Sequence, residues 1–292
     1  MVEDRRSGRA AVGGVTRVRT FYDQEGWRWV DGMSGDARRW GTTTRGPIQA
    51  HLDRRRTEHL RRLLRLEGPE APAGGASLIE FGGGGQPATS LLAGVRAYTA
   101  VDISAEGLKA AKAALAPFPV EVELVEADVR AVPLPDGTFD AAYCAHMIYH
   151  VPTAADQRRV LREMARVVRP GGTLAVVMSE PYPWLFPGRC LRRAVADTPV
   201  LGGVVRKLRP DPPLPFLPLP SRWMCEVLAD LGTTSVRCYS VPTTAFSRRV
   251  DERNAVGRLL WSGVSLLETH WSQAGRRAGC YCVVALHKHP AG

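Results

Sequence analysis

Four consecutive glycines follow a short apolar stretch that ends in an acid, and this run could bind a nucleotide-like ligand. The apolar stretch ends at Glu80 and Phe81, and residues 82–85 are all glycine. Because glycine has no Cβ, it adopts positive φ without strain and lets a ligand approach the main chain closely. A strand, a glycine turn and a helix open a nucleotide-binding α/β unit. The sequence therefore predicts a ligand site at this turn.

The spacing of the glycines separates two classes of ligand. A dinucleotide fingerprint requires Gly-x-Gly-x-x-Gly, and Pro87 stands at the position of its third glycine. The other pattern, an acid two residues before Gly-x-Gly, is matched by Glu80, Gly82 and Gly84. The glycine run therefore argues against NAD or FAD.

Two acids further along the chain could bind the sugar and base of such a ligand. Asp102 stands 20 residues after Gly82, where a carboxylate can accept hydrogen bonds from both ribose hydroxyls. Asp128 follows the next expected strand, and its carboxylate could accept a hydrogen bond from an adenine amino group. A helix cap or a solvated loop acid is the alternative interpretation of Asp128.

One histidine stands where a base or an acceptor-orienting group could act. His146 follows the expected strand 139–144, at the carboxyl edge where open α/β sheets bind ligands. Histidine titrates near neutral pH, which suits a base, although a histidine here can also be structural. His150 is expected to be structural, and His51 and His270 are more distant candidates.

Alternating strands and helices must position these residues. The expected strands are 77–81, 97–101, 120–126, 139–144, 173–178, 235–241 and 279–286. The expected helices are 48–66, 88–93, 105–115, 156–168, 221–231 and 251–273, with N-caps at Ser104 and Ser221. This alternation is typical of βαβ units and a mainly parallel sheet.

The ordered set of motifs resembles the class I S-adenosylmethionine (SAM)-dependent methyltransferases, in the type 11-like subgroup of small-molecule enzymes. The resemblance covers about residues 77–180. Its five motifs are the Glu80 glycine run, Asp102, Asp128, Pro-Leu-Pro-Asp-Gly-Thr-Phe-Asp-Ala-Ala-Tyr-Cys at 133–144 and Arg-Pro-Gly-Gly-Thr-Leu at 169–174. It implies an α/β, Rossmann-like, doubly wound sheet of seven strands with lid insertions. It also implies SAM as cofactor and S-adenosylhomocysteine as product.

The resemblance implies roles for the matching positions. Glu80 orders the loop or lies near the ligand's amino group, Ile103 packs against the adenine, and the Val129 N–H reads the adenine edge with Asp128. Ala145 and His146 line the methyl-transfer site. The implied cofactor-binding residues are Tyr22, Glu80, Phe81, Gly82, Gly84, Gln86, Asp102, Ile103, Asp128, Val129 and Ala145.

One position departs from the family pattern. Family members usually carry a third glycine where Gln86 stands. Gln86 could crowd the methionine carboxyl end of the ligand or hydrogen-bond to it, and Gly85 could supply the missing conformational freedom.

Segments outside the matched region are expected to cover the site. Tyr22 lies in a Phe-Tyr-Asp segment that resembles the one closing over the ligand, and it could cover the methionine end; an amphipathic helix that packs its aromatics is the alternative. Insertions at about 181–220 and 242–278 are expected to form a lid, with Trp184 and Trp261 as acceptor-binding candidates. The alternative is that these insertions pack as a second small core.

The domain plan follows from these segments. Residues 1–14 are expected to be a flexible tail, 15–76 a helical cap, and 77–292 the SAM-binding domain with its lid insertions.

Composition bounds the remaining classes. The net charge of +10 comes mainly from arginines in separate segments, which favours a generally basic surface over a nucleic-acid face. The six cysteines include no Cys-x-x-Cys pair, so we expect reduced thiols and no metal site. No apolar run is long enough to span a bilayer and the start lacks a signal-peptide core, so we expect a cytoplasmic protein without membrane insertion.

The expected function is SAM-dependent methyl transfer to a small-molecule acceptor by an enzyme of secondary metabolism or a related biosynthesis. O-methylation is favoured over N- or C-methylation. One alternative is an RNA or tRNA methyltransferase, which the charge favours but which lacks an RNA-binding module and the Asn/Asp-Pro-Pro-Tyr/Phe motif. Another is a SAM-binding protein that does not methylate. The expected state is a monomer or a homodimer.

Overall fold

Seven strands form one mixed sheet in the computed structural model, which describes residues 15–26, 47–181, 198, 214–239, 255–270 and 281–291. The strand order is β3-β2-β1-β4-β5-β7-β6. The strands are β1 Ala76–Phe81, β2 Val95–Asp102, β3 Glu121–Glu126, β4 Phe139–Ala145, β5 Val168–Ser179, β6 Gly232–Tyr239 and β7 Tyr281–Lys288. Pairs from β3 to β5 are parallel, and β7 is antiparallel to β5 and β6. Each strand overlaps its expected range, which confirms the doubly wound seven-stranded fold.

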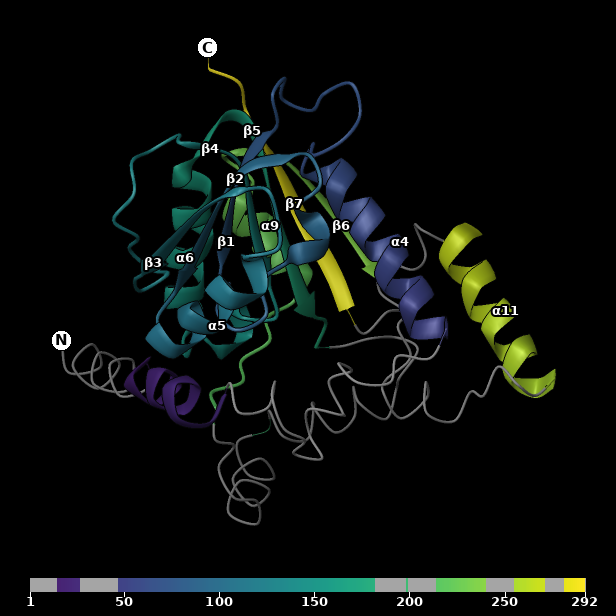
Figure 1. Ribbon diagram of the computed structural model, residues 1–292. Coiled ribbons are helices and arrows are strands. Elements are labelled where there is room, and N and C mark those ends of the chain that lie inside the picture. Colours follow the sequence, from purple (N-terminus) through teal and green to yellow (C-terminus); the bar gives the residue numbers. More distant parts are fainter. Residues whose placement is uncertain are drawn as a thin grey trace.

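Helices cover both faces of the sheet (Figure 1). They are α4 Pro47–Leu63, α5 Ala105–Leu115, α6 Ala154–Val167 and α9 Ser221–Leu228. The helix α11 Ala255–His270 stands apart from the sheet in Figure 1, and the short turns are η1 Tyr22–Gly26, η2 Thr89–Leu91 and η3 Ile148–His150. Residues 15–21 are helical and run into η1, a turn of π-helix. The side chains of α6 and α9 pack on one face, and those of α4 and α5 on the other.

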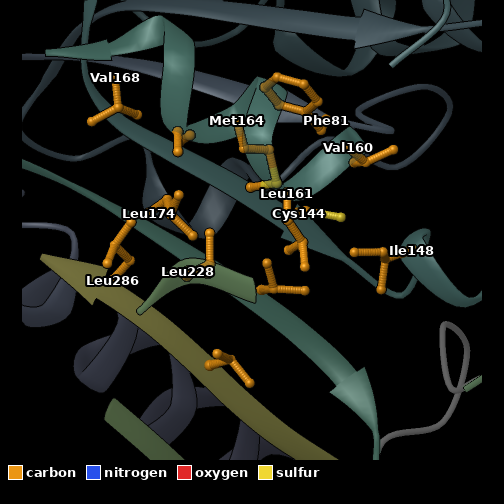
Figure 2. Packing of buried hydrophobic residues seen from close by; sticks show 14 of the residues in the cluster. Phe81, Cys144, Ile148, Val160, Leu161, Met164, Val168, Leu174, Leu228 and Leu286 are labelled. Atoms are coloured by element: carbon orange, nitrogen blue, oxygen red, sulfur yellow. The ribbon is translucent and has the colours of Figure 1, made fainter. Parts of the chain in front are cut away.

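The larger core lies between the sheet and the α6–α9 layer, and Figure 2 shows its packing. Apolar residues of α6 recur at helical spacing, so Val160, Leu161 and Met164 face the sheet and are fully buried. They pack with Phe81 of β1 and Cys144 of β4, whose side chains point to this same face of the sheet. This core fixes the carboxyl ends of β1 and β4 side by side.

The expected helix at 88–93 is wrong, because only the short turn η2 forms there. Five glycines and one proline stand among the 13 residues from 82 to 94, and both residue types oppose helix formation. Leu60 of α4 and Leu64, which follows the end of α4, pack on the face of the sheet that η2 also contacts. The helix α4 itself contacts η2. A helix that precedes β1 in the chain therefore covers the β1–β2 crossover.

The two expected N-caps had different outcomes. Ser104 caps α5 as expected, since its Oγ accepts a hydrogen bond from Gly107 N at 3.0 Å. Ser221 is not a cap, because the cap position is Pro220 and the carboxylate of Glu180 accepts from Ser221 N at 3.3 Å. A distant acid thus replaces the local hydroxyl at α9.

Several expectations concern segments outside the described residues. These are the tail 1–14 and most of the insertions 181–220 and 242–278. Where the chain is described, no helix is long and apolar enough to cross a membrane, and no cluster of metal-binding side chains occurs. Among the described side chains, Cys144 and Cys282 are buried and Cys225 is half-buried.

Leu161→Ala tests the core that aligns β1 with β4. The side chain of Leu161 is fully buried, so we expect the free energy of unfolding to fall by about 2–5 kcal/mol in urea titrations. Arg159→Ala on the same helix is the matched control and should cost under about 1 kcal/mol, because the Arg159 side chain is mostly exposed and the buried Asp156 keeps its ion pair with Arg130. Equal losses in the two variants would contradict the assigned packing.

Candidate functional site

The glycine loop at 82–86 donates all of its backbone N–H groups within the protein. Gly82 N and Gly83 N donate to Val101 O at 2.8 and 3.3 Å, and Gly85 N donates to Gly107 O at 2.7 Å. Gly84 N donates to Asp102 Oδ2 at 3.0 Å, and Gln86 N donates to Gly84 O. A phosphate-binding loop points free N–H groups at its ligand. This loop therefore fits a ligand without phosphate, in agreement with the argument against a dinucleotide.

Glu80 supports the loop from beneath. Its side chain is 3% exposed, and its Oε2 accepts from Ala88 N at 2.8 Å and from the Tyr98 hydroxyl. A Cβ on Gly83 would lie 3.2 Å from the Glu80 Cγ, so the loop rests on the stem of this side chain. Burial raises the pKa of Glu80 to about 7, although both hydrogen bonds act to lower it. Of its two implied roles, the geometry supports the ordering of the loop.

Asp102 joins the loop to the start of α5. Its Oδ2 accepts from Gly84 N and its Oδ1 accepts from Ser104 N at 2.9 Å. Burial raises the pKa of this carboxyl group, and the backbone hydrogen bonds oppose the rise. Each carboxylate oxygen has a second lone pair, so Asp102 can still accept from two ribose hydroxyls.

The described N-terminal segment lies over the ends of β2 and β3, beside α5, where Figure 1 shows it in purple. Asp23 Oδ1 accepts from Ser104 Oγ at 2.7 Å. Arg19 donates to Ile103 O at 3.1 Å and forms an ion pair with Glu126 at 3.3 Å. The segment therefore covers the edge of the sheet where Asp102 ends β2.

Tyr22 lies within this covering segment. Burial, and then the neighbouring charge of Asp102, raises the pKa of Tyr22 to about 12. The phenol therefore stays neutral and lies near the expected ribose acid. The expected cover of the methionine end by Tyr22 stays a prediction.

Asp128 is already bound by a side chain two residues further on. Its oxygens accept from Arg130 Nε at 3.0 Å and from Nη2 at 2.6 Å. Burial raises the pKa of Asp128, but the hydrogen bonds and charge of Arg130 outweigh burial and lower it overall. The adenine role of Asp128, with Val129, stays a prediction and requires the carboxylate to serve both partners.

The loop after β4 meets the glycine loop. Gly82 has φ +78°, and a Cβ added to it would lie 2.7 Å from the Cγ of Met147. The chain order β1, β2, β3 runs to one side of β1, and β4 lies on its other side. Open α/β sheets bind ligands at such a switch point. We therefore expect the ligand crevice at this switch point, where Gly82 meets the loop at residues 145–147.

His146 occupies a strained position at this crevice. Its φ is +57°, a conformation rare outside glycine and enriched at functional sites, and its N donates to Val177 O at 2.9 Å. Burial lowers the pKa of the ring to about 3, with further contributions from the positive charges of Arg56 and His150. The imidazole is therefore neutral at pH 7.

Gln86 and Phe81 lie differently from a simple ligand contact. The Gln86 side chain is exposed and its φ is not positive, whereas Gly85 has φ +49°. Gly85 therefore adopts the left-handed conformation in this part of the loop, and its compensation for Gln86 stays a prediction. Phe81 is fully buried in the core, so any contribution to a ligand comes from its main chain.

The remaining candidates divide into structural and undescribed residues. The His150 ring binds Pro215 O through Nδ1 at 2.8 Å, which agrees with a structural role. Trp184 lies outside the described residues, and the side chains of His51, Trp261 and His270 do as well. Their proposed roles stay predictions.

Sequence reasoning missed Tyr98 and Arg19. Strand alternation places residues 98, 100 and 102 on one face of β2, and this pattern could have pointed to Tyr98 beside Glu80. No local pattern marks Arg19, because its partner Ile103 is 84 residues away.

Comparison with known proteins identifies the relatives of this fold. Residues 79–176 match the family described as a methyltransferase domain. The chain is 34% identical over 109 residues to the ubiquinone/menaquinone biosynthesis C-methyltransferase UbiE of Hahella chejuensis, covering 35% of this chain and 43% of that protein. It is 34% identical over 122 residues to the 27-O-demethylrifamycin SV methyltransferase of Amycolatopsis mediterranei, covering 38% and 42%. The chain thus spans less than half the length of these relatives.

Solved structures share the fold over a larger part of the chain. The N-methyltransferase NodS from Bradyrhizobium japonicum, in complex with S-adenosylhomocysteine, matches with a TM-score of 0.51 and 13% identity, covering 87% of this chain and 96% of that one. The [4+2]-cyclase SpnF matches with a TM-score of 0.50 and 20% identity, covering 82% of each chain. Similarity at this level establishes the fold.

Gly82→Ala tests the contact between the two loops. We expect it to lower the free energy of unfolding and to weaken binding of S-adenosylhomocysteine, because a Cβ both strains φ and collides with Met147. Gly74→Ala is the matched control, since Gly74 has φ +80° with nothing within 4 Å, and it should cost only about 1 kcal/mol. Urea unfolding and calorimetry give both quantities. The assigned contact is wrong if Met147→Gly, which removes both the Cβ and the Cγ that the new Cβ would meet, fails to restore part of the loss in the double variant.

Proposed function

We propose that this chain, which belongs to the class I SAM-dependent methyltransferases, transfers the methyl group of SAM to a small-molecule acceptor. The observation that carries the proposal is the glycine loop, whose N–H groups are hydrogen bonded within the protein and not free for a phosphate. Its Gly84 N–H donates to Asp102, the acid proposed to bind the ribose, and both residues lie inside the matched domain. This arrangement gives one carboxylate two tasks, to order the loop and to accept from a sugar.

The residues at the carboxyl edge fit SAM. Asp102 has spare lone pairs for the ribose hydroxyls, Ile103 stands next to it for the adenine face, and Asp128 offers an acceptor at the end of β3. Tyr22 covers this edge as a neutral, buried phenol. Bound SAM supplies a methyl group already activated on a sulfonium. The protein therefore has to bind, orient and shield the reacting groups rather than generate an electrophile.

His146 is proposed to orient the acceptor. A general base works best when its pKa lies near the operating pH, and burial holds the pKa of His146 far below that range. A neutral imidazole can still accept or donate one hydrogen bond to an acceptor hydroxyl or amine. Its place between the Gly82 crevice and β5 suits that role.

The acceptor is proposed to be a biosynthetic intermediate of secondary metabolism that is methylated on oxygen. The relative named 27-O-demethylrifamycin SV methyltransferase supports this choice, and the relative named C-methyltransferase keeps carbon as an alternative acceptor atom. Trp184 and Trp261, in the insertions, are proposed to contact this acceptor. A cytoplasmic location and a monomeric or homodimeric state belong to the same proposal.

A second function remains for the same fold. The [4+2]-cyclase SpnF shares the architecture, so this fold is not restricted to proteins named as methyltransferases. A SAM-binding protein that does not methylate is therefore the alternative. The net charge of +10 keeps RNA as a third acceptor class, which salt-dependent binding would reveal.

Calorimetry and a product assay decide between these functions. We expect the protein to bind SAM and S-adenosylhomocysteine, and to release S-adenosylhomocysteine when incubated with SAM and hydroxylated aromatic or quinol acceptors. Tight binding of SAM without turnover on any acceptor would favour the non-methylating alternative. Turnover on tRNA alone would favour the RNA alternative, and no binding of SAM would refute the proposal.

His146→Gln separates orientation from base catalysis. We expect kcat/KM for the acceptor to fall by less than about tenfold, because the amide can still form a hydrogen bond, while loss of a true base would cost about 10²–10⁴. The Kd for SAM should stay unchanged. The wild-type pH–rate profile should show no limb near pH 6.5. A larger loss together with such a limb would make His146 the base.

A further inference from the structure

A buried phenol contacts the acid beneath the glycine loop. Tyr98 lies in the middle of β2, is fully buried, and pairs in register with Leu78 of β1. Its hydroxyl donates to Glu80 Oε2. Buried phenol hydroxyls usually find a partner, but this partner is itself a buried carboxylate that holds the loop.

The same carboxylate oxygen connects the strand to the far end of the loop. Glu80 Oε2 also accepts from Ala88 N at 2.8 Å, three residues after Gly85. The Glu80 stem lies under Gly83, and Asp102 holds Gly84. Asp102 thus holds the middle of the loop, and Glu80 holds its far end at Ala88. The hold at Ala88 depends on one Glu80 oxygen, which also accepts from Tyr98.

We infer that Tyr98 is a positioning residue for the cofactor loop, acting through the Glu80 carboxylate on Ala88 N–H. This inference rests on the proposed function, because the loop is assigned to SAM. Without the phenol, Glu80 keeps one donor and its buried carboxylate can rotate away from Ala88. The loop then samples conformations in which Gly84 and the crevice no longer fit the cofactor.

The charge state of Glu80 makes this role measurable. Burial raises its pKa to about 7, and the Tyr98 hydrogen bond acts to lower it. Hydrogen bonds to a carboxylate are stronger than those to its protonated form, so the hold on Ala88 weakens as the pH falls through 7. Removal of Tyr98 should raise the pKa further and start this weakening at higher pH.

The surroundings of Glu80 contain few other titratable groups among the described residues. The groups that interact with Glu80 or Tyr98 are Asp102 on β2 and Tyr143 and Cys144 on β4. Burial raises the pKa of the Cys144 thiol to about 12, and burial also raises the pKa of Asp102. Asp102 is the other carboxyl group beside the loop whose pKa is raised, so Glu80 has to be tested directly.

Tyr98→Phe and Glu80→Gln test the inference in the full-length chain. In wild type, the affinity for S-adenosylhomocysteine measured by calorimetry should fall as the pH drops from 8 to 6. In Tyr98→Phe the midpoint of this fall should rise by about one pH unit, which weakens binding about fivefold at pH 7. In Glu80→Gln the dependence should disappear. An unchanged dependence in Glu80→Gln, or an unchanged midpoint in Tyr98→Phe, overturns the inference.

Amide hydrogen exchange of the ligand-free protein gives a readout that does not need cofactor binding. Ala88 N–H should exchange about tenfold faster in Tyr98→Phe, relative to amides in the core of β4. Tyr149→Phe is the control, because it removes another buried phenol hydroxyl and should leave Ala88 unchanged. Uniform acceleration at all amides would mean that Tyr98 contributes only to stability. If wild type fails to bind S-adenosylhomocysteine, the proposed function fails while the exchange data still test Tyr98.

Discussion

The backbone N–H groups of the glycine loop have to be hydrogen bonded, because the loop lies at the buried end of β1. Their acceptors are Val101 O, the Asp102 carboxylate and Gly107 O, so β2 and α5 hold the loop in place. Glu80 completes the set at Ala88 N. The geometry of the candidate site therefore depends on the sheet: the register between β1 and β2 places these acceptors under the loop.

The hydrogen bonding of the loop N–H groups to acceptors within the protein has a chemical consequence. A loop with free N–H groups attracts anions, whereas this loop is flanked by two buried acids instead. The Asp102 and Glu80 carboxylates are both buried, and burial raises the pKa of each. Buried acids are stabilised by cationic ligands, and a sulfonium with an ammonium group is such a ligand. The electrostatics of the edge and the family assignment thus agree.

Local spacing predicted the parts of the site that lie close in sequence. The strand before the glycine turn, the strand that ends at Asp102 and the Ser104 cap follow from patterns of a few residues, and all are present. The pairing of Asp23 with Ser104 joins residues 81 apart, and no pattern in one sequence encodes it. The crossover at 88–93 failed for a different reason, since apolar spacing suggested a helix that the flanking glycines and Pro87 oppose.

The cover that α4 provides changes what counts as the domain. Leu60 and Leu64 seal the face of the sheet that a crossover helix between β1 and β2 would otherwise seal, and β7, from the C-terminal end, pairs with β5. The stretch that matches the methyltransferase family, 79–176, therefore relies on residues outside it to cover part of this face and to pair with the β7 side of β5. The limits of the family match thus differ from the limits of the packed sheet, which takes α4 from before β1 and β7 from the C-terminal part of the chain.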